Sequence, residues 1–229
     1  MTAEEKRVDK IMNEKEALKW LSDRMPVGDD CYVMSWEGRN LLLTTDMLHS
    51  NSDFPTGTTS YTMGWRSVAV SLSDIAAMGG DPKALVIAYG SSRFDLDELE
   101  DFLEGAEDVA GKYGARIVGG DLDRHGEFTV VTTVLGEAES PVSRKGASPG
   151  DLVAVTGDLG RTAAALELFE TGDYERANDL FRFDPRVEPG RKLVSLASSM
   201  MDISDGLARS LHQLADINDV GFRIKADRI

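Results

Sequence analysis

The chain has 229 residues, of which 41% are hydrophobic and 28% charged, as is usual for a globular protein. Its formal net charge of −15 argues against a nucleic-acid partner, because such proteins set Lys and Arg against phosphates. No apolar stretch approaches the roughly 20 residues that cross a bilayer, the charged N-terminus does not resemble a signal peptide, and a single cysteine excludes an internal disulfide framework. We therefore expect a cytoplasmic protein without a membrane or nucleic-acid partner.

Helical and strand patterns mix in the first part of the chain. Apolar residues recur with the helical period in three segments, which predict helices at 4–24, 59–78 and 96–113. Apolar and β-branched runs predict strands at 31–36, 40–45, 83–89 and 127–135. The first two strands are joined by Glu37-Gly38-Arg39 and are expected to form a hairpin, and the third helix is expected to begin after Asp95.

A cluster of proline and glycine in residues 138–150 predicts a boundary between two domains. Beyond it, the patterns predict strands at 152–156 and 221–226 and helices at 161–170, 173–181, 189–199 and from Leu207 through Leu214. Because helices and strands mix without strict alternation, an α+β fold is favoured over a doubly wound sheet. We expect two domains, 1–138 and 139–229, each with a mixed or antiparallel sheet packed with helices.

Aspartate recurs where predicted apolar elements end. The five places are 28–30, 44–46, 73–74, 119–121 and 202–206. Magnesium is a hard cation that takes oxygen ligands, usually carboxylates together with water and substrate phosphates. If the five places converge, each pair of carboxylates repels by about 4 kcal/mol near a protein surface, and bound cations would be needed to offset this. The pattern predicts a magnesium site, on the condition that the fold brings these aspartates together.

Each place also has a structural interpretation, because Asp and Gly favour turns for backbone reasons. Ser204 could N-cap the helix that follows it, although this leaves Asp202 without a role. Asp74 is harder to explain, since it lies in a helical pattern where aspartate has a poor propensity. It falls on the same side of that helix as Ser67 and Ser71. Spacing alone leaves both interpretations open.

Motifs for other chemistries are missing from the sequence. It has no GxxxxGK[ST] loop, no GxGxxG that opens a helix after a strand, and no His/Cys zinc spacing. His49, His125 and His212 are scattered, as surface residues are. Cys31 lies at the start of a predicted strand, where a packed thiol is favoured over a nucleophile. These observations argue against covalent and zinc mechanisms.

A series of longer motifs carries more information than the single aspartates. In chain order they are GDDCYV, LLLTTDML, MGWRSVAVSLSDIAAMGGDPKA, IVGGD, SRKGASPGDLVAVTGDLG and MDISDGLARSL. From Pro26 onward, their order resembles the thiamine-monophosphate kinase family, within the superfamily of aminoimidazole ribonucleotide synthetase and selenophosphate synthetase. The TTDML form, and the lack of a glycine-rich Cys loop at the N-terminus, favour the kinase over the other members.

The resemblance implies a kinase that uses ATP and several Mg²⁺ ions to convert thiamine monophosphate into thiamine diphosphate by direct in-line transfer. No covalent residue and no general base is expected. The resemblance assigns magnesium binding to Asp30, Thr44, Thr45, Asp46, Asp74, Asp121, Asp202 and Asp205. It assigns ATP binding to Gly120, Asp121, Arg144 and Ser204. Asp53 is expected to contact the acceptor, at a place where relatives commonly carry a histidine.

Family members form homodimers, so the resemblance also implies pairing through domain 1–138, which would bind ATP and magnesium. Because family members are longer than this chain, domain 139–229 is expected to be incomplete. Two alternatives stay open: another ATP-using enzyme of the superfamily, and a non-catalytic nucleotide-binding fragment.

Overall fold

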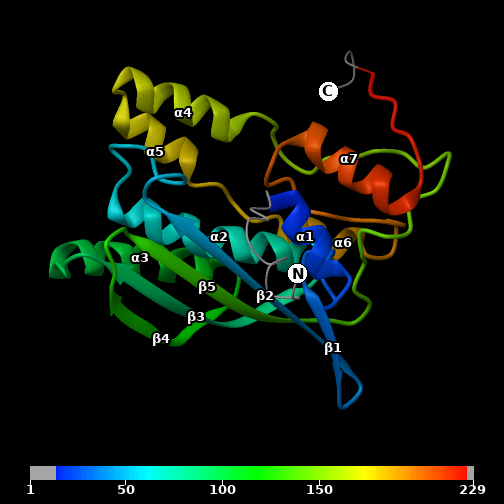
Figure 1. Cartoon of the computed structure of the whole chain (residues 1–229), viewed down its shortest axis with the longest axis horizontal. Coiled ribbons are helices and arrows are strands. Elements are labelled where there is room, and N and C mark those ends of the chain that lie inside the picture. Colours follow the sequence, from blue (N-terminus) through cyan, green and yellow to red (C-terminus); the bar gives the residue numbers. More distant parts are fainter. Residues whose placement is uncertain (1–13, 226–229) are drawn as a thin grey trace, which may run out of the picture.

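The structure is a computed structural model that describes residues 14–225, so the predicted start of the first helix and end of the last strand lie outside the described residues. Helices and strands follow one another in mixed order (Figure 1). The strands are β1 (Tyr32–Trp36), β2 (Arg39–His49), β3 (Asp81–Ser91), β4 (Arg116–Arg124) and β5 (Thr129–Ala138). The helices are α1 (Glu14–Ser22), α2 (Ser60–Ala77), α3 (Leu96–Lys112), α4 (Arg161–Thr171), α5 (Tyr174–Phe181), α6 (Val187–Leu193) and α7 (Leu207–Asn218).

The five strands form one mixed sheet in the order β1-β2-β5-β3-β4. Strands β3 and β4 are parallel and are connected through α3, whereas the other neighbours are antiparallel. The predicted hairpin is confirmed: Trp36 pairs with Arg39, and Glu37 and Gly38 both have positive φ, as a tight two-residue hairpin turn requires. The predicted α+β class is confirmed as well.

Side-chain caps fix the two long helices at the predicted places. Thr59 caps α2 by accepting a hydrogen bond from the backbone N–H of Thr62, and Asp95 caps α3 in the same way through Glu98. By contrast, β2 runs further than predicted, and no strand was predicted at β4. Residues 119–121 were expected to form a turn, but they continue β4, because this stretch pairs with β3 beyond the two glycines.

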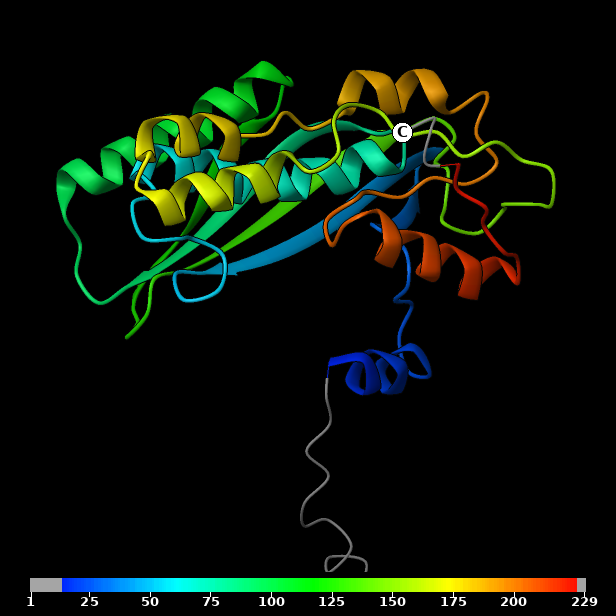
Figure 2. The same cartoon turned by 90° about the horizontal axis from the view of Figure 1, so that it is seen from above.

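Helices α2 and α3 lie together on one side of the sheet (Figure 2). Fully buried apolar side chains fill the space between them and the sheet: Leu42, Val68, Leu72, Ile75, Leu85, Phe102, Val109, Val130 and Val134. Glycine lets the two helices approach each other closely. A Cβ on Gly64 would lie 1.8 Å from the carbonyl oxygen of Phe102, and a Cβ on Gly105 would lie 2.0 Å from that of Tyr61. This packing makes α2 the most buried helix that the structure describes.

The other face of the sheet carries exposed apolar side chains. Strand residues alternate between the two faces, so every second residue of β2 points away from α2. Large side chains exposed on this face include Leu43, Met47, Val86 and Leu135, with exposed fractions of 44%, 58%, 40% and 37%. Tyr32, Met34 and Trp36 of β1 are exposed on the same face, because they pair with every second residue of β2 that points away from α2. We call this surface the open face. None of the helices in residues 14–225 is both long and apolar enough to cross a membrane.

The part of the chain after Ala138 is helical and irregular as far as Lys225. Helices α5 and α6 pack against α2, with Trp65 donating a hydrogen bond from Nε1 to the carbonyl of Phe183. The strands predicted at 152–156 and 221–226 are not formed in the described residues, and Leu152 is 95% exposed. A strand needs a neighbour to pair with its backbone, and no described residue after Ala138 belongs to one. The predicted second sheet is therefore absent from residues 139–225.

Candidate functional site

Three carboxylates from distant parts of the chain meet at one point. Asp30 lies in the loop before β1, Asp74 in the last turn of α2, and Asp202 in the loop before α7. One oxygen atom from each lies within 4.8 Å of the others. We call these three residues the carboxylate cluster. The structure thus brings together three of the five aspartate-containing places in the sequence.

Strand β2 adds a fourth carboxylate and a hydroxyl beside this cluster. Thr44 and Asp46 both point from β2 toward α2, because they are two residues apart on a strand. Thr44 donates a hydrogen bond from Oγ1 to Oδ2 of Asp74 over 2.5 Å, and Ser71 donates from Oγ to Oδ2 of Asp46 over 2.8 Å. The side of α2 that carries Ser71 and Asp74 therefore faces polar partners on the sheet, which explains why polar residues recur there.

The polar contacts between α2 and the sheet continue further along the helix. Thr132 of β5 lies 2.6 Å from Ser71, hydroxyl to hydroxyl, and donates a hydrogen bond of 2.8 Å to the carbonyl of Ser67. All three residues are buried. Asp46 is thus held by a buried network on a helix and two strands, which fixes the direction of its carboxylate.

Arg144 binds Asp30 with a two-pronged ion pair. Its Nε donates to Oδ2 over 3.1 Å and its Nη2 to Oδ1 over 2.5 Å, and the side chain of Asp30 is fully buried. Asp29 supports both partners, since its Oδ1 accepts the backbone N–H of Asp30 and that of Arg144, each over 3.1 Å. The Nη1 atom of Arg144 reaches Gln213 of α7 at 3.3 Å. The guanidinium is therefore held at the edge of the carboxylate cluster.

Burial and mutual repulsion raise the pKa values of these carboxyls. Desolvation, followed by the charge of Asp46, raises the pKa of Asp74 to about 9. Desolvation, followed by the charge of Asp30, raises the pKa of Asp202 to about 7. The pKa of Asp46 is also raised, again mainly by burial. A divalent cation would reverse this cost, because it favours the ionised form of each carboxyl that it contacts.

The donor set suits magnesium. Apart from the Arg144 guanidinium at its edge, the side chains described here around the cluster offer carboxylate and hydroxyl oxygens, and hard cations prefer oxygen ligands. The described residues place no histidine or cysteine ligand within this group. The sequence-based expectation of an oxygen-ligated cation fits the residues that the structure brings together.

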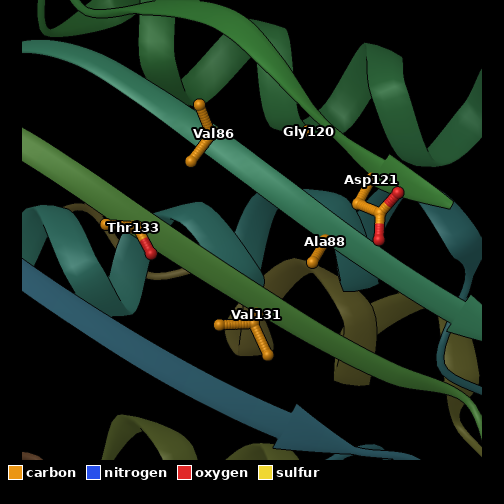
Figure 3. A pocket seen from close by; sticks show the side chains of 6 residues that line it. All are labelled: Val86, Ala88, Gly120, Asp121, Val131 and Thr133. Atoms are coloured by element: carbon orange, nitrogen blue, oxygen red, sulfur yellow. The ribbon is translucent and has the colours of Figure 1, made fainter.

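Three of the expected residues lie on the open face instead. Thr45 points away from α2, and its Oγ1 lies 3.0 Å from that of Thr133. Gly120 and Asp121 line a hollow of about 260 Å³ on the same face, with Val86, Ala88, Val131 and Thr133 (Figure 3). Strand β4 is separated from β2 by two strands, so Asp121 lies about 14 Å from β2 at the usual strand spacing. Within one chain, Asp121 does not join the carboxylate cluster.

The remaining expected residues are exposed or turned to local partners. Asp205 forms an ion pair with Arg209, one turn further along α7, with Nε and Oδ2 3.3 Å apart. Ser204 is exposed and is not the N-cap of α7, because that position is held by Gly206, which has no side-chain cap. Asp53 accepts hydrogen bonds of 2.7 Å from the backbone N–H of His49 and the hydroxyl of Ser52.

Several residues of the site were missed from the sequence. Asp29 lies between Gly28 and Asp30 in the sequence, but nothing there indicated that it holds the backbone of Arg144. Ser71 shares a helix side with Asp74, which was a usable signal. Gln213 and Asn218 carried none, because each looks like an ordinary surface residue of a helix. Asn218 donates a hydrogen bond to the carbonyl of Arg144 and accepts two more from the same loop.

Comparisons with known proteins agree on one group. Residues 28–138 match the family model described as AIR synthase related protein, N-terminal domain, and residues 148–229 match its C-terminal domain. The chain is 54% identical to the thiamine-monophosphate kinase of Halobacterium salinarum over 219 residues, which is 95% of this chain and 75% of that protein. The enzyme of the same name from Methanospirillum hungatei is 45% identical over 205 residues, which is 88% of this chain and 69% of that protein.

Solved structures give the same picture. A structure described as AaThiL complexed with AMPPCP and TMP superposes with a TM-score of 0.84 and 29% identity, covering 93% of this chain and 74% of that one. The thiamine monophosphate kinase of Aquifex aeolicus gives a TM-score of 0.77 at 30% identity, covering 90% and 73%. Hydrogenase maturation protein HypE shares the fold at 21% identity and a TM-score of 0.62, covering 80% of this chain and 59% of that one.

Proposed function

The chain belongs to the thiamine-monophosphate kinase family, and from this premise we propose that it transfers the γ-phosphoryl group of ATP to the phosphate of thiamine monophosphate. The products are thiamine diphosphate and ADP. The observation that carries the proposal is the carboxylate cluster of Asp30, Asp74 and Asp202 with Arg144 at its edge. A related structure that superposes on this chain is described as holding both an ATP analogue and TMP.

Asp30, Asp74 and Asp202, with Asp46 and Thr44 beside them, hold Mg²⁺ in this proposal. Mg²⁺ held there would supply positive charge against the polyphosphate and against the charge that develops during in-line attack. The protein's own part is to fix the direction of its oxygens. Thr44 orients Asp74 and Ser71 orients Asp46, each through the hydrogen bond described above. Such preorientation removes the cost of rearranging the site during the reaction.

Arg144 contributes the one cationic side chain that touches the carboxylate cluster among the described residues. Its planar guanidinium can bind phosphate oxygens through two parallel hydrogen bonds, as it binds Asp30 here. We assign it to the phosphates of ATP. The acceptor phosphate is already largely ionised at neutral pH, so no residue has to remove a proton before the attack. Direct transfer between two phosphates mainly requires positioning and charge neutralisation.

We also propose that the chain works as a homodimer that pairs through the open face. The support is the row of exposed apolar side chains on that face, because contiguous apolar patches often mark surfaces that bind another protein. Thr45, Gly120 and Asp121 lie on the same face and would be brought to the interface. In this proposal Asp121 and its hollow would bind Mg·ATP at the interface between the two copies, apart from the carboxylate cluster of their own chain.

The remaining assignments concern the rim of the site. Ser204 and Asp205 come two and three residues after Asp202 and are exposed, so we assign Ser204 to ATP and Asp205 to a further Mg²⁺. Asp53 is assigned to the acceptor. Its loop, 50–58, follows β2 directly, and β2 also carries Thr44 and Asp46.

A direct assay of both products tests the proposed reaction. Purified protein is incubated with ATP, Mg²⁺ and thiamine monophosphate, and both ADP and thiamine diphosphate are quantified by chromatography. We expect the two products in equal amounts, none when EDTA is added, and none when thiamine replaces its monophosphate. Binding of Mg·ATP without any thiamine diphosphate would refute the kinase assignment and favour a nucleotide-binding fragment. ADP release that does not depend on thiamine monophosphate would favour another acceptor.

A further inference from the structure

Asn218, the last residue of α7, has every hydrogen-bonding group of its side chain in use. Its Oδ1 accepts the backbone N–H of Gly146 over 2.7 Å and that of Ala147 over 3.1 Å. Its Nδ2 donates to the carbonyl of Arg144 and to that of Leu214, each over 2.9 Å. A side-chain amide has two donors and two acceptor lone pairs, so this arrangement is complete.

Three of these four hydrogen bonds go to the loop that carries Arg144. The backbone of Arg144 is held on both sides: its N–H by Asp29, and its carbonyl by Asn218 and by Ser199, whose Oγ donates over 2.7 Å. Arg144 has a second contact with α7, because its guanidinium donates a hydrogen bond to Gln213. The position of the guanidinium is therefore set by the loop's attachment to α7 as well as by Asp30.

We infer that Asn218 is a positioning residue. It affects nucleotide binding by holding Arg144 in place and does not touch the nucleotide itself. The inference rests on the proposed function, in which Arg144 binds the phosphates of ATP. Glutamine alone carries the same amide, and its side chain is one methylene longer. Aspartate cannot donate to the two carbonyls, leucine makes no hydrogen bond, and the serine hydroxyl is shorter and has a single donor. Loss of the amide leaves the carbonyl of Arg144 with Ser199 alone, so the guanidinium samples positions away from the cluster.

A purely structural role is the competing explanation, and the chain offers a matched control. Asn178 of α5 holds a different loop in the same way. It donates to the carbonyls of Gly57 and Tyr174 over 2.9 and 2.7 Å, and its Oδ1 accepts the backbone N–H of Thr59 over 2.9 Å. It is 4% exposed and has no contact with Arg144 or the carboxylate cluster. Replacing Asn178 removes the same kind of hydrogen bonds at a place that the inference does not connect to ATP.

The experiment compares N218A, N218D and N178A with R144A and with the double variant R144A/N218A. For each, the melting temperature and the dissociation constant of Mg·ATP are measured by scanning and titration calorimetry. We expect R144A to weaken Mg·ATP binding about 10- to 100-fold, as for a lost hydrogen bond to a charged group. We expect N218A and N218D to weaken it about 3- to 10-fold. N178A should lower the melting temperature to a similar extent as N218A and leave the dissociation constant unchanged.

The double variant separates positioning from structure. If Asn218 acts through Arg144, adding N218A to R144A produces no further loss of Mg·ATP affinity. Equal losses in both backgrounds, or unchanged affinity in folded N218A and N218D, would overturn the inference. Unchanged affinity in R144A would instead refute the assignment of Arg144 to ATP in the proposed function, so the two failures are distinguishable. Should N218A not fold, N218D carries the same comparison, since it keeps both acceptor contacts.

Discussion

Asp74→Asn should make the protein more stable in EDTA while it abolishes tight Mg·ATP binding. Asparagine has almost the same shape as aspartate and still accepts the hydrogen bond from Thr44. It is neutral without binding a proton, so folding no longer requires protonation to avoid the repulsion with Asp46, Asp30 and Asp202. The substitution therefore separates the effect of the carboxylate on stability from its role in binding Mg·ATP.

The size of the effect follows from proton linkage. Burial and neighbouring carboxylates raise the pKa of Asp74 to about 9 in the folded protein, from an ordinary value of 3.8. Between these values the folded state holds a proton that the unfolded state has lost, so the free energy of unfolding falls as pH rises. The largest slope for one proton is about 1.4 kcal/mol per pH unit. The raised pKa of Asp46 shows that part of the electrostatic destabilisation belongs to that residue and stays when Asp74 is replaced. We therefore expect Asp74→Asn to raise the free energy of unfolding by about 1–3 kcal/mol at pH 8 and by almost nothing at pH 4.

Thermal unfolding in EDTA between pH 4 and pH 9 checks this expectation. For a chain of this size, a gain of 1 kcal/mol raises the melting temperature by about 2–4 °C. Asp101→Asn is the control, because Asp101 is exposed on α3, far along the chain from the cluster. With Mg·ATP added, the parent should gain stability and Asp74→Asn should not. A lower melting temperature for Asp74→Asn at pH 8 would refute the electrostatic reasoning, and unchanged Mg·ATP binding would refute the ligand assignment.

Three further predictions concern other parts of the proposed site. Met47→Glu places a charge in the open face, so light scattering after gel filtration should show a monomer, whereas a dimer would contradict pairing through this face. Arg144→Ala frees Asp30 from its ion pair, so nucleotide-free protein should bind Mn²⁺ about tenfold more tightly by calorimetry, and weaker binding would contradict competition between Arg144 and the cation. Asp53→Asn removes a charge that would face the cationic thiazolium ring, so the KM for thiamine monophosphate should rise several-fold; a KM that changes for ATP alone would contradict the acceptor assignment.

Local signals were sufficient to predict most elements of the first 138 residues. The long α2 and α3 each begin at a capping residue that is visible in the sequence, and the hairpin between β1 and β2 has a turn that few residues other than glycine accept at its second position. The strands that were predicted wrongly depend on whether another strand lies beside them. Whether residues 152–156 form a strand is decided by a neighbouring strand, and an apolar pattern does not reveal whether one is present.

The candidate site was predictable in its residue types but not in its grouping. The sequence showed which aspartates could bind a cation, and four of them meet around the last turns of α2. It did not show that Thr44 and Thr45 point to opposite faces of the sheet, since that depends on which face α2 covers. Nor did it indicate Asn218, because a residue that supports another through backbone contacts leaves no mark in its own neighbourhood.

The distribution of the site over the fold has a physical reason. Asp74 pays the highest electrostatic cost, and it lies on α2, which is anchored by apolar packing against the sheet and by close contact with α3. A carboxyl with a pKa raised to about 9 persists only where the surrounding contacts are strong enough to hold it. Arg144 and Asp202 come from irregular segments, where few such contacts exist. Their positions therefore depend on polar attachments such as Asp29 and Asn218, and substitutions there should change nucleotide binding more readily than substitutions in the apolar core of α2.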